Sequence, residues 1–229
     1  MKKYDILLAD ADNTLLDFTT SERVAASSLF KEFGAEPDDK LLDDYSEYND
    51  SLWKRLERGE LTMKELISLR FTGFFKDHGI KGDGDAAAVR YRQILSKCAY
   101  KTEGADELLQ KCRGRIRVYI ISNGKAEVQL SRLRLSGIAD ITDGIFLSEI
   151  IGVQKPDTYF FTKAASLIEG FAKDRALIYG DSLTADIAGG VNSGIDTCWY
   201  NPGGIINRTP YIPDYEIRKH SDLYSILQI

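Results

Sequence analysis

The strongest constraint on the fold of this 229-residue chain is a series of short apolar runs without polar–apolar alternation. The runs lie at residues 6–9, 116–121, 144–147, 176–179 and 196–200. Strands of a parallel sheet have this pattern because helices cover both faces of the sheet. Helix-length segments separate most of the runs and end near a glycine. The sequence therefore predicts an α/β fold, a doubly wound parallel sheet with a Rossmann-like core.

One long segment, from about residue 19 to 100, interrupts the alternation, and helix signals follow one another along it. Thr19 with Glu22, and Thr62 with Glu65, have the capping-box spacing that begins a helix. Leucine and aromatic residues recur at helical spacing after these positions. An all-helical insert is therefore expected directly after the first strand.

The insert divides the chain into two predicted domains. The catalytic α/β core is expected to comprise residues 1–17 and 98–229, and the helical cap residues 18–97. A chain of 229 residues is long enough for a large domain with a modest second lobe.

Composition excludes several classes of partner. The net charge of −5 and the pI near 5.2 argue against a nucleic acid polymer or an anionic membrane as the ligand. No segment approaches the roughly 20 apolar residues that a membrane span needs, and the apolar stretch before Asp10 is too short for a signal peptide. The three cysteines lack CxxC spacing, which is typical of reduced thiols. We expect a cytoplasmic monomer or homodimer.

Reactive groups follow four of the predicted strands. They are Asp10, Asp12 and Thr14 after the first, Ser122, Asn123 and Gly124 after the second, Lys155 after the third, and Asp181 and Asp186 after the fourth. A lone Asp-x-Asp pattern more often stabilises a turn. Ligands of open parallel sheets, however, bind beyond the carboxyl ends of the strands. Four such groups at one edge therefore indicate a functional site.

The residue types suit phosphoryl transfer. Magnesium prefers oxygen ligands, which Asp10, Asp181 and a backbone carbonyl near Asp12 can supply. Lys155 and the Ser122 hydroxyl can hold the phosphoryl group and offset its charge. A carboxylate such as Asp10 can attack phosphorus and form an aspartyl-phosphate. Asp12 can protonate the leaving alcohol and later accept a proton from water. We expect a magnesium-dependent phosphatase acting on a small-molecule phosphate ester.

These segments resemble the four ordered motifs of the haloacid dehalogenase superfamily, and the helical insert resembles that superfamily's cap. The resemblance implies catalytic roles for Asp10, Asp12, Ser122 and Lys155. It implies magnesium binding by Asp10, Asp12 and Asp181, with Asp186 in support. It implies phosphate binding or orientation by Thr14, Asn123 and Gly124. Dehalogenases of the superfamily lack the second aspartate of the first motif, so the presence of Asp12 favours a phosphatase.

Phrases in the helical insert, at residues 49–53 and 57–60, resemble the noncanonical pyrimidine 5′-nucleotidases, which implies a pyrimidine nucleoside 5′-monophosphate as substrate. A base needs an aromatic face and a few hydrogen-bond donors. Candidates in the insert are Asn49, Trp53 and Arg70. Core packing against Leu52 is the favoured alternative for Trp53, and a solvated or salt-bridged surface position is the favoured alternative for Arg70.

Three alternatives remain open from the sequence. A sugar-phosphate phosphatase or a phosphomutase of the same superfamily would use the same aspartyl-phosphate. A binding or regulatory module without activity would belong to a different class and predicts a missing motif residue, whereas every motif residue is present.

Overall fold

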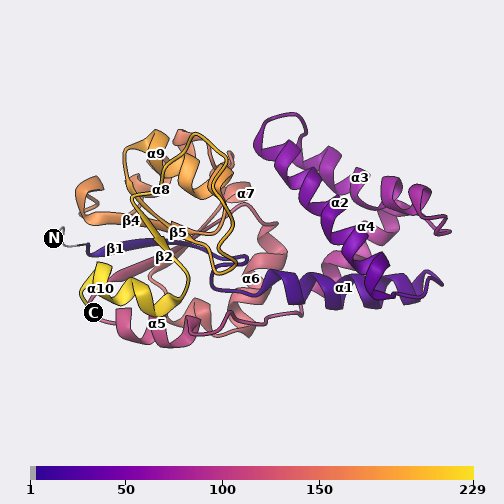
Figure 1. Ribbon diagram of the computed structural model, residues 1–229, viewed down its shortest axis with the longest axis horizontal. Helices are drawn as coiled ribbons and strands as arrows, with labels where there is room; N and C mark the ends of the chain where they lie inside the picture. Colours follow the sequence, from indigo (N-terminus) through magenta and orange to yellow (C-terminus); the bar gives the residue numbers. More distant parts are fainter. Residues whose placement is uncertain (1–3) are drawn as a thin grey trace. The chain divides into compact units, whose positions relative to one another are not determined.

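The structure, a computed structural model, describes residues 4–229, so residues 1–3 of the predicted core lie outside the described residues. The described chain forms two compact units, which Figure 1 draws as an α/β part and a purely helical part. The α/β unit contains residues 4–17 and 100–229, and the helical unit contains Phe18–Ala99. The second boundary lies two residues further along the chain than the sequence indicates.

A parallel sheet forms the centre of the α/β unit. Among residues 4–229 it has six strands in the order β3-β2-β1-β4-β5-β6. They are β1 (Ile6–Asp10), β2 (Arg117–Ser122), β3 (Gly144–Leu147), β4 (Ala176–Gly180), β5 (Asp196–Tyr200) and β6 (Tyr215–Ile217). Because β1 lies between β2 and β4, the strand order changes direction beside it, where sheets of this kind bind ligands. The predicted doubly wound α/β fold is confirmed, with β6 as an unpredicted sixth strand.

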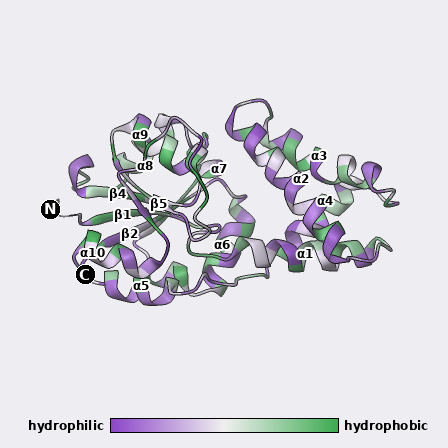
Figure 2. Cartoon of the chain, in the orientation of Figure 1, coloured by the Kyte–Doolittle hydropathy of each residue, from purple (hydrophilic) through white to green (hydrophobic). Residues whose placement is uncertain are grey.

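Both faces of the sheet are covered, which explains why its strands show no alternation. Leu7 and Ala9 of β1 join a buried cluster that includes helices α5 (Ala105–Cys112) and α10 (Leu223–Leu227). Ile6 and Leu8 face the opposite cluster, which includes α8 (Thr158–Ser166). Figure 2 shows the resulting hydrophobic stretch along β1. The remaining helices are α6 (Ala126–Leu135), α7 (Ser148–Ile151) and α9 (Ala188–Ser193).

The helical unit consists of α1 (Phe18–Glu32), α2 (Asp39–Glu57), α3 (Met63–Asp77) and α4 (Gly84–Leu95). Aromatic rings from all four helices form its core, and Phe30 of α1 stacks on Phe74 of α3 with ring centroids 5.5 Å apart. Tyr45 of α2 stacks on Phe71 at 5.4 Å and meets Tyr91 of α4 at 5.9 Å. No helix within residues 4–229 is long and apolar enough to span a membrane.

The two predicted capping boxes differ in outcome. The Thr62–Glu65 box is confirmed, with both reciprocal hydrogen bonds present. The Thr19–Glu22 box is wrong, since α1 already begins at Phe18. The Glu22 carboxylate instead accepts hydrogen bonds from the side chains of Ser46 and Asn49 in α2. The Glu22 side chain thus makes a tertiary contact with α2.

The ends of the helical unit join the α/β unit at one place. The Asp17 N–H donates to the Tyr100 carbonyl at 3.0 Å. Leu16 and Lys101 also pair as an antiparallel bridge. The chain therefore leaves and re-enters the α/β unit through adjacent backbone segments.

Candidate active site

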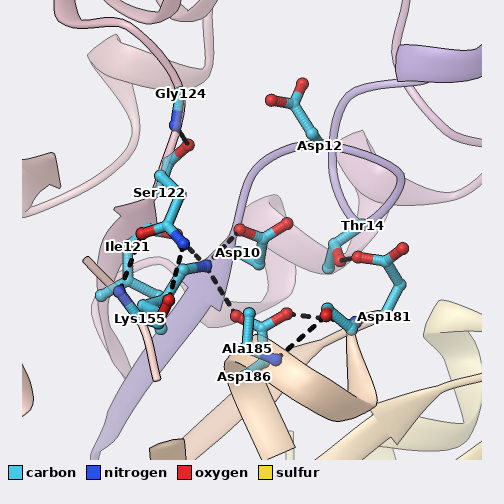
Figure 3. Close-up of polar contacts among 12 residues, drawn as sticks. Asp10, Asp12, Thr14, Ile121, Ser122, Gly124, Lys155, Asp181, Ala185 and Asp186 are labelled. Carbon is cyan, nitrogen blue, oxygen red and sulfur yellow. Dashed lines mark hydrogen bonds and ion pairs between the residues drawn. The ribbon is translucent and has the colours of Figure 1, made fainter. Parts of the chain in front are cut away.

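A buried lysine links two carboxylates at the carboxyl end of β1. Figure 3 shows the Lys155 amine between Asp10 and Asp186, and its Nζ donates to one oxygen of each at 2.6 Å. The Ile121 carbonyl of β2 accepts a third hydrogen bond from Nζ at 3.0 Å. Burial alone would lower the pKa of Lys155, but the attraction of Asp10 and Asp186 outweighs it and raises that pKa. The amine therefore stays charged.

A third carboxylate, that of Asp181, follows β4. One oxygen from each of Asp10, Asp181 and Asp186 lies within 4.8 Å of the others. The Thr14 hydroxyl donates to Asp181 Oδ1 at 3.3 Å, and the Trp199 indole N–H donates to the Asp181 carbonyl at 2.9 Å. The cluster thus joins residues of the first and fourth predicted motifs.

The charges in this cluster do not balance, because three carboxylates face one ammonium. Burial raises the pKa of Asp10 to about 8; Lys155 opposes the rise, and the charge of Asp186 adds to it. Burial, together with repulsion from Asp10, also raises the pKa of Asp181. An oxygen-rich site with excess negative charge fits a divalent cation such as Mg²⁺.

Asp186 lies in a π-helical turn, Leu183–Ile187, directly before α9. Such turns are frequent at functional sites. A Cβ at Gly180 would lie 2.2 Å from Asp186 Oδ2, so only glycine at the end of β4 leaves room for this carboxylate. The Ser182 N–H donates to the same oxygen at 3.2 Å. The glycine of the fourth motif therefore has a packing role.

The second motif fixes the backbone of Lys155. The Asn123 amide donates to the Lys155 carbonyl and accepts from the Lys155 N–H, both at 2.9 Å. Ser122 is 1% exposed, and its Oγ accepts from the Gly124 N–H at 3.1 Å. Asn123 thus positions Lys155, and Ser122, directly before Asn123, ends β2.

Asp12 has partners that sequence reasoning missed. Its carboxylate accepts hydrogen bonds from Arg132 Nη1 and from Gln129 Nε2, both on α6. In Figure 3 the Asp12 carboxylate lies apart from the Lys155 contacts. The structure therefore places the predicted core residues at one sheet edge and adds Gln129 and Arg132 to them.

The three candidates in the helical unit lie near one another within that unit. Arg70 is 8% exposed, so the surface alternative for it is wrong. Its guanidinium carbon lies 5.8 Å from the Trp53 ring centroid and 5.5 Å from that of Tyr91. Asn49 Nδ2 donates to Glu22 at 2.6 Å. Trp53 is partly buried against a leucine cluster, so core packing accounts for part of its ring.

Within the described residues, two buried polar atoms of this group have no hydrogen-bond partner: Asn49 Oδ1 and Arg70 Nε. Buried polar atoms are normally paired, so each exception asks for an explanation. Both atoms have almost no exposed surface, so a ligand would reach them only after nearby side chains move.

Comparison with known proteins gives consistent matches over the whole chain. A family model described as haloacid dehalogenase-like hydrolase matches residues 4–194. The pyrimidine 5′-nucleotidase PynA of Streptococcus pneumoniae is 40% identical over 225 residues, covering 98% of this chain and 95% of PynA. The pyrimidine 5′-nucleotidase YjjG of Escherichia coli is 30% identical, covering 87% of each chain.

Solved structures agree with these matches. The HAD-hydrolase YfnB of Bacillus subtilis, in a crystal form bound to magnesium, is 38% identical with a TM-score of 0.95 and full coverage of both chains. An L-2-haloacid dehalogenase from Xanthobacter autotrophicus is 15% identical with a TM-score of 0.75 and covers 98% of each chain. The second match shows the shared fold alone.

Proposed function

This chain belongs to the haloacid dehalogenase-like hydrolases, and we propose that it is a magnesium-dependent phosphatase of pyrimidine nucleoside 5′-monophosphates. The observation that carries the chemistry is the buried cluster of Asp10, Asp181, Asp186 and Lys155 at the ends of β1 and β4. The nucleotide substrate is supported by the similarity to PynA and YjjG, which are named for that activity.

The first half of the reaction forms a covalent intermediate. A carboxylate oxygen of Asp10 attacks phosphorus, the ester P–O bond breaks, and an aspartyl-phosphate results. Asp12 gives a proton to the departing 5′-oxygen, which leaves as the nucleoside hydroxyl. The Lys155 ammonium and the Ser122 hydroxyl hold the phosphoryl oxygens and offset their charge.

The second half releases phosphate. Asp12, now ionised, accepts a proton from a water molecule whose oxygen attacks the phosphorus of the aspartyl-phosphate. The bond between phosphorus and the Asp10 oxygen breaks, so Asp10 returns to its carboxylate form and inorganic phosphate departs. Asn123 keeps Lys155 in place through both halves by its two backbone hydrogen bonds.

Asp10, Asp181 and a backbone carbonyl near Asp12 would hold the magnesium, with Asp186 in support. When bound, Mg²⁺ offsets the negative charge on the phosphoryl oxygens. The raised pKa values of Asp10 and Asp181 support a cation at this place, because burial raises both and the charge of Asp186 adds to each rise. The magnesium-bound crystal form of YfnB adds support by similarity.

Asn49, Trp53 and Arg70 are proposed to recognise the pyrimidine. A pyrimidine edge carries both hydrogen-bond donors and acceptors, and its ring stacks on aromatic faces. Asn49 Oδ1 is an acceptor without a partner and Arg70 Nε a donor without one, both within the described chain. The support for a base comes from the residue types, an aromatic ring beside groups that can hydrogen-bond a base edge.

Phosphate release from a panel of esters tests the proposal. The panel contains pyrimidine and purine monophosphates, hexose phosphates and a haloacid control, each with magnesium and with EDTA. We expect magnesium-dependent release, fastest for the pyrimidine monophosphates.

Each other outcome favours a different function. Faster release from hexose phosphates would keep the mechanism and replace the substrate with a sugar phosphate. Conversion of a hexose phosphate into its isomer would indicate a phosphomutase. No release from any ester would contradict catalysis and favour a binding module.

A further inference from the structure

A buried pair of side chains on α6 holds the carboxylate of Asp12 by both oxygens. Arg132 Nη1 donates to Asp12 Oδ1 at 2.5 Å, and Gln129 Nε2 donates to Oδ2 at 2.9 Å. The Arg132 side chain is fully buried and that of Asp12 is 28% exposed. Arg132 therefore lies in the interior, whereas the Asp12 carboxylate is accessible to solvent or a substrate.

The orientation of the Gln129 amide is fixed from both sides. Its Oε1 accepts from Arg132 Nη1 at 2.9 Å, so its nitrogen must face the other way. That nitrogen donates to Asp12 Oδ2 and also to Ser122 Oγ at 2.9 Å. The two protons of one amide therefore connect the proposed acid/base with a proposed phosphate ligand.

The glycine of the second motif makes room for this link. A Cβ at Gly124 would lie 2.5 Å from Gln129 Cγ and 2.8 Å from Cδ. Atoms at that separation overlap, so any other residue at 124 would displace the Gln129 side chain. Gly124 therefore has a second role beside its N–H bond to Ser122.

Two energetic effects restrict the movement of the Asp12 carboxylate against Arg132 and Gln129. A buried guanidinium without a nearby carboxylate is strongly destabilising, because its charge is desolvated without compensation. Two hydrogen bonds to one carboxylate also restrict its rotation more than one does. The rigid placement of a reacting group matters, since a misplacement of about 1 Å can reduce the rate by about 100-fold.

Resting on the phosphatase function above, we propose that Gln129 and Arg132 are positioning residues that hold Asp12 for proton transfer and couple its position to Ser122. They touch neither substrate nor phosphate in this scheme. Their effect on the rate passes entirely through Asp12 and Ser122.

The test compares two substrates that differ in their need for an acid. The alkoxide leaving group of uridine 5′-monophosphate needs the Asp12 proton, whereas p-nitrophenolate leaves without one. Arg132→Met and Gln129→Leu preserve volume and remove the donors to Asp12. Arg134→Met, at an exposed position on the same helix, is the matched control.

For both variants we expect kcat on uridine 5′-monophosphate to fall about 10- to 100-fold with KM within about twofold of wild type. With p-nitrophenyl phosphate we expect a rapid burst of one p-nitrophenolate per enzyme followed by slow turnover, because only hydrolysis of the aspartyl-phosphate still needs Asp12. In an Asp12→Asn background, Arg132→Met should add little further loss.

Three results would overturn the proposal. They are wild-type kinetics in both variants, an equal loss on both substrates without a burst, and full additivity with Asp12→Asn. If Arg132→Met does not fold, Gln129→Leu decides. If the wild type prefers another ester, that ester replaces the nucleotide in the test. If the wild type hydrolyses no ester, the phosphatase function itself has failed, which is a separate outcome.

Discussion

The two units of the molecule treat their buried charges differently. At the sheet edge of the α/β unit, Lys155 pairs with Asp10 and Asp186, and Arg132 pairs with Asp12. In the helical unit the buried carboxylate of Glu22 accepts hydrogen bonds from the neutral side chains of Ser46 and Asn49, and the charge of Arg70 acts on it to lower its pKa. Charges that pair within one unit are in place before a substrate arrives. The ion pairs at the sheet edge support the proposal that catalysis belongs to the α/β unit.

The helical unit differs in a second way, because two of its buried polar atoms lack a hydrogen-bond partner. Asn49 Oδ1 and Arg70 Nε have no hydrogen-bond partner among the described residues. Such atoms cost stability when buried and gain free energy when a partner binds. The comparison therefore favours recognition by helix side chains and catalysis by strand ends.

The largest expected effect is on catalysis in the α/β unit. Asp10→Asn should reduce phosphate release at least about 1,000-fold, because an amide does not attack phosphorus as a carboxylate does. The variant should still fold, since Lys155 retains Asp186 and the Ile121 carbonyl. Phosphate release and circular dichroism measure the two. Asp174→Asn, at an exposed position, is the control, and substantial turnover by Asp10→Asn would exclude the covalent route.

A second prediction concerns stability of the helical unit with pH. Burial raises the pKa of Glu22 from 4.5 to about 7, although its hydrogen bonds from Ser46 and Asn49 oppose the rise. The folded state then binds more protons than the unfolded state between these values, so stability falls as pH rises through 7, by up to about 3 kcal/mol. Glu22→Gln should remove this slope in urea titrations. Glu47→Gln, exposed on α2, is the control.

The contribution of His220, in the α/β unit, should depend on pH in the opposite direction to that of Glu22. Burial lowers the pKa of His220 from 6.5 to about 4. Its ring nitrogens lie 2.8 Å from Thr102 Oγ1 and 2.7 Å from the Tyr179 hydroxyl. Stability from the neutral ring is present above pH 6.5 and lost as pH falls through 4, by up to about 3 kcal/mol. His220→Gln should flatten urea midpoints across that window, with the more exposed His78 as control. An unchanged pH dependence in His220→Gln would remove the predicted contrast between His220 and Glu22.

The smallest expected effect is on recognition. Asn49→Ala and Arg70→Met should each raise KM for uridine 5′-monophosphate about 10-fold, the loss of roughly one hydrogen bond. Both should leave kcat/KM for p-nitrophenyl phosphate within about twofold, because that ester has no pyrimidine. Steady-state kinetics with Arg58→Met, exposed on the same unit, provide the comparison. Equal losses on both esters would move these residues from recognition to structure.

Sequence patterns predicted the strand-end residues because most of them directly follow an apolar run typical of a buried strand. For Asp10, Ser122 and Asp181 the position of the preceding strand was enough to predict them. Gln129 and Arg132 were missed because polar residues inside a helix usually face solvent. A signal existed, since they lie on the same helix face as Val128 and Leu133, which are buried. Polar residues on the apolar face of a helix are therefore candidates for a functional role.

Other errors arose from contacts between distant segments. The predicted cap at Thr19 is wrong because α1 begins one residue earlier, at Phe18, and Glu22 bonds residues more than 20 positions away in α2. Helix α5 was not predicted, because it is only eight residues long. Its buried residues Ala105, Leu108 and Cys112 do have helical spacing. Strand β6 has three residues and depends on pairing with β5. Short elements stabilised by neighbours have weak local signals.

The hydrogen bond between Asp17 and Tyr100 has an evolutionary consequence. Since the ends of the helical unit are held side by side, its 82 residues, Phe18–Ala99, can be exchanged for another insert without altering the strand order. A lineage could therefore acquire new substrates by recombination at this junction while inheriting its chemistry unchanged.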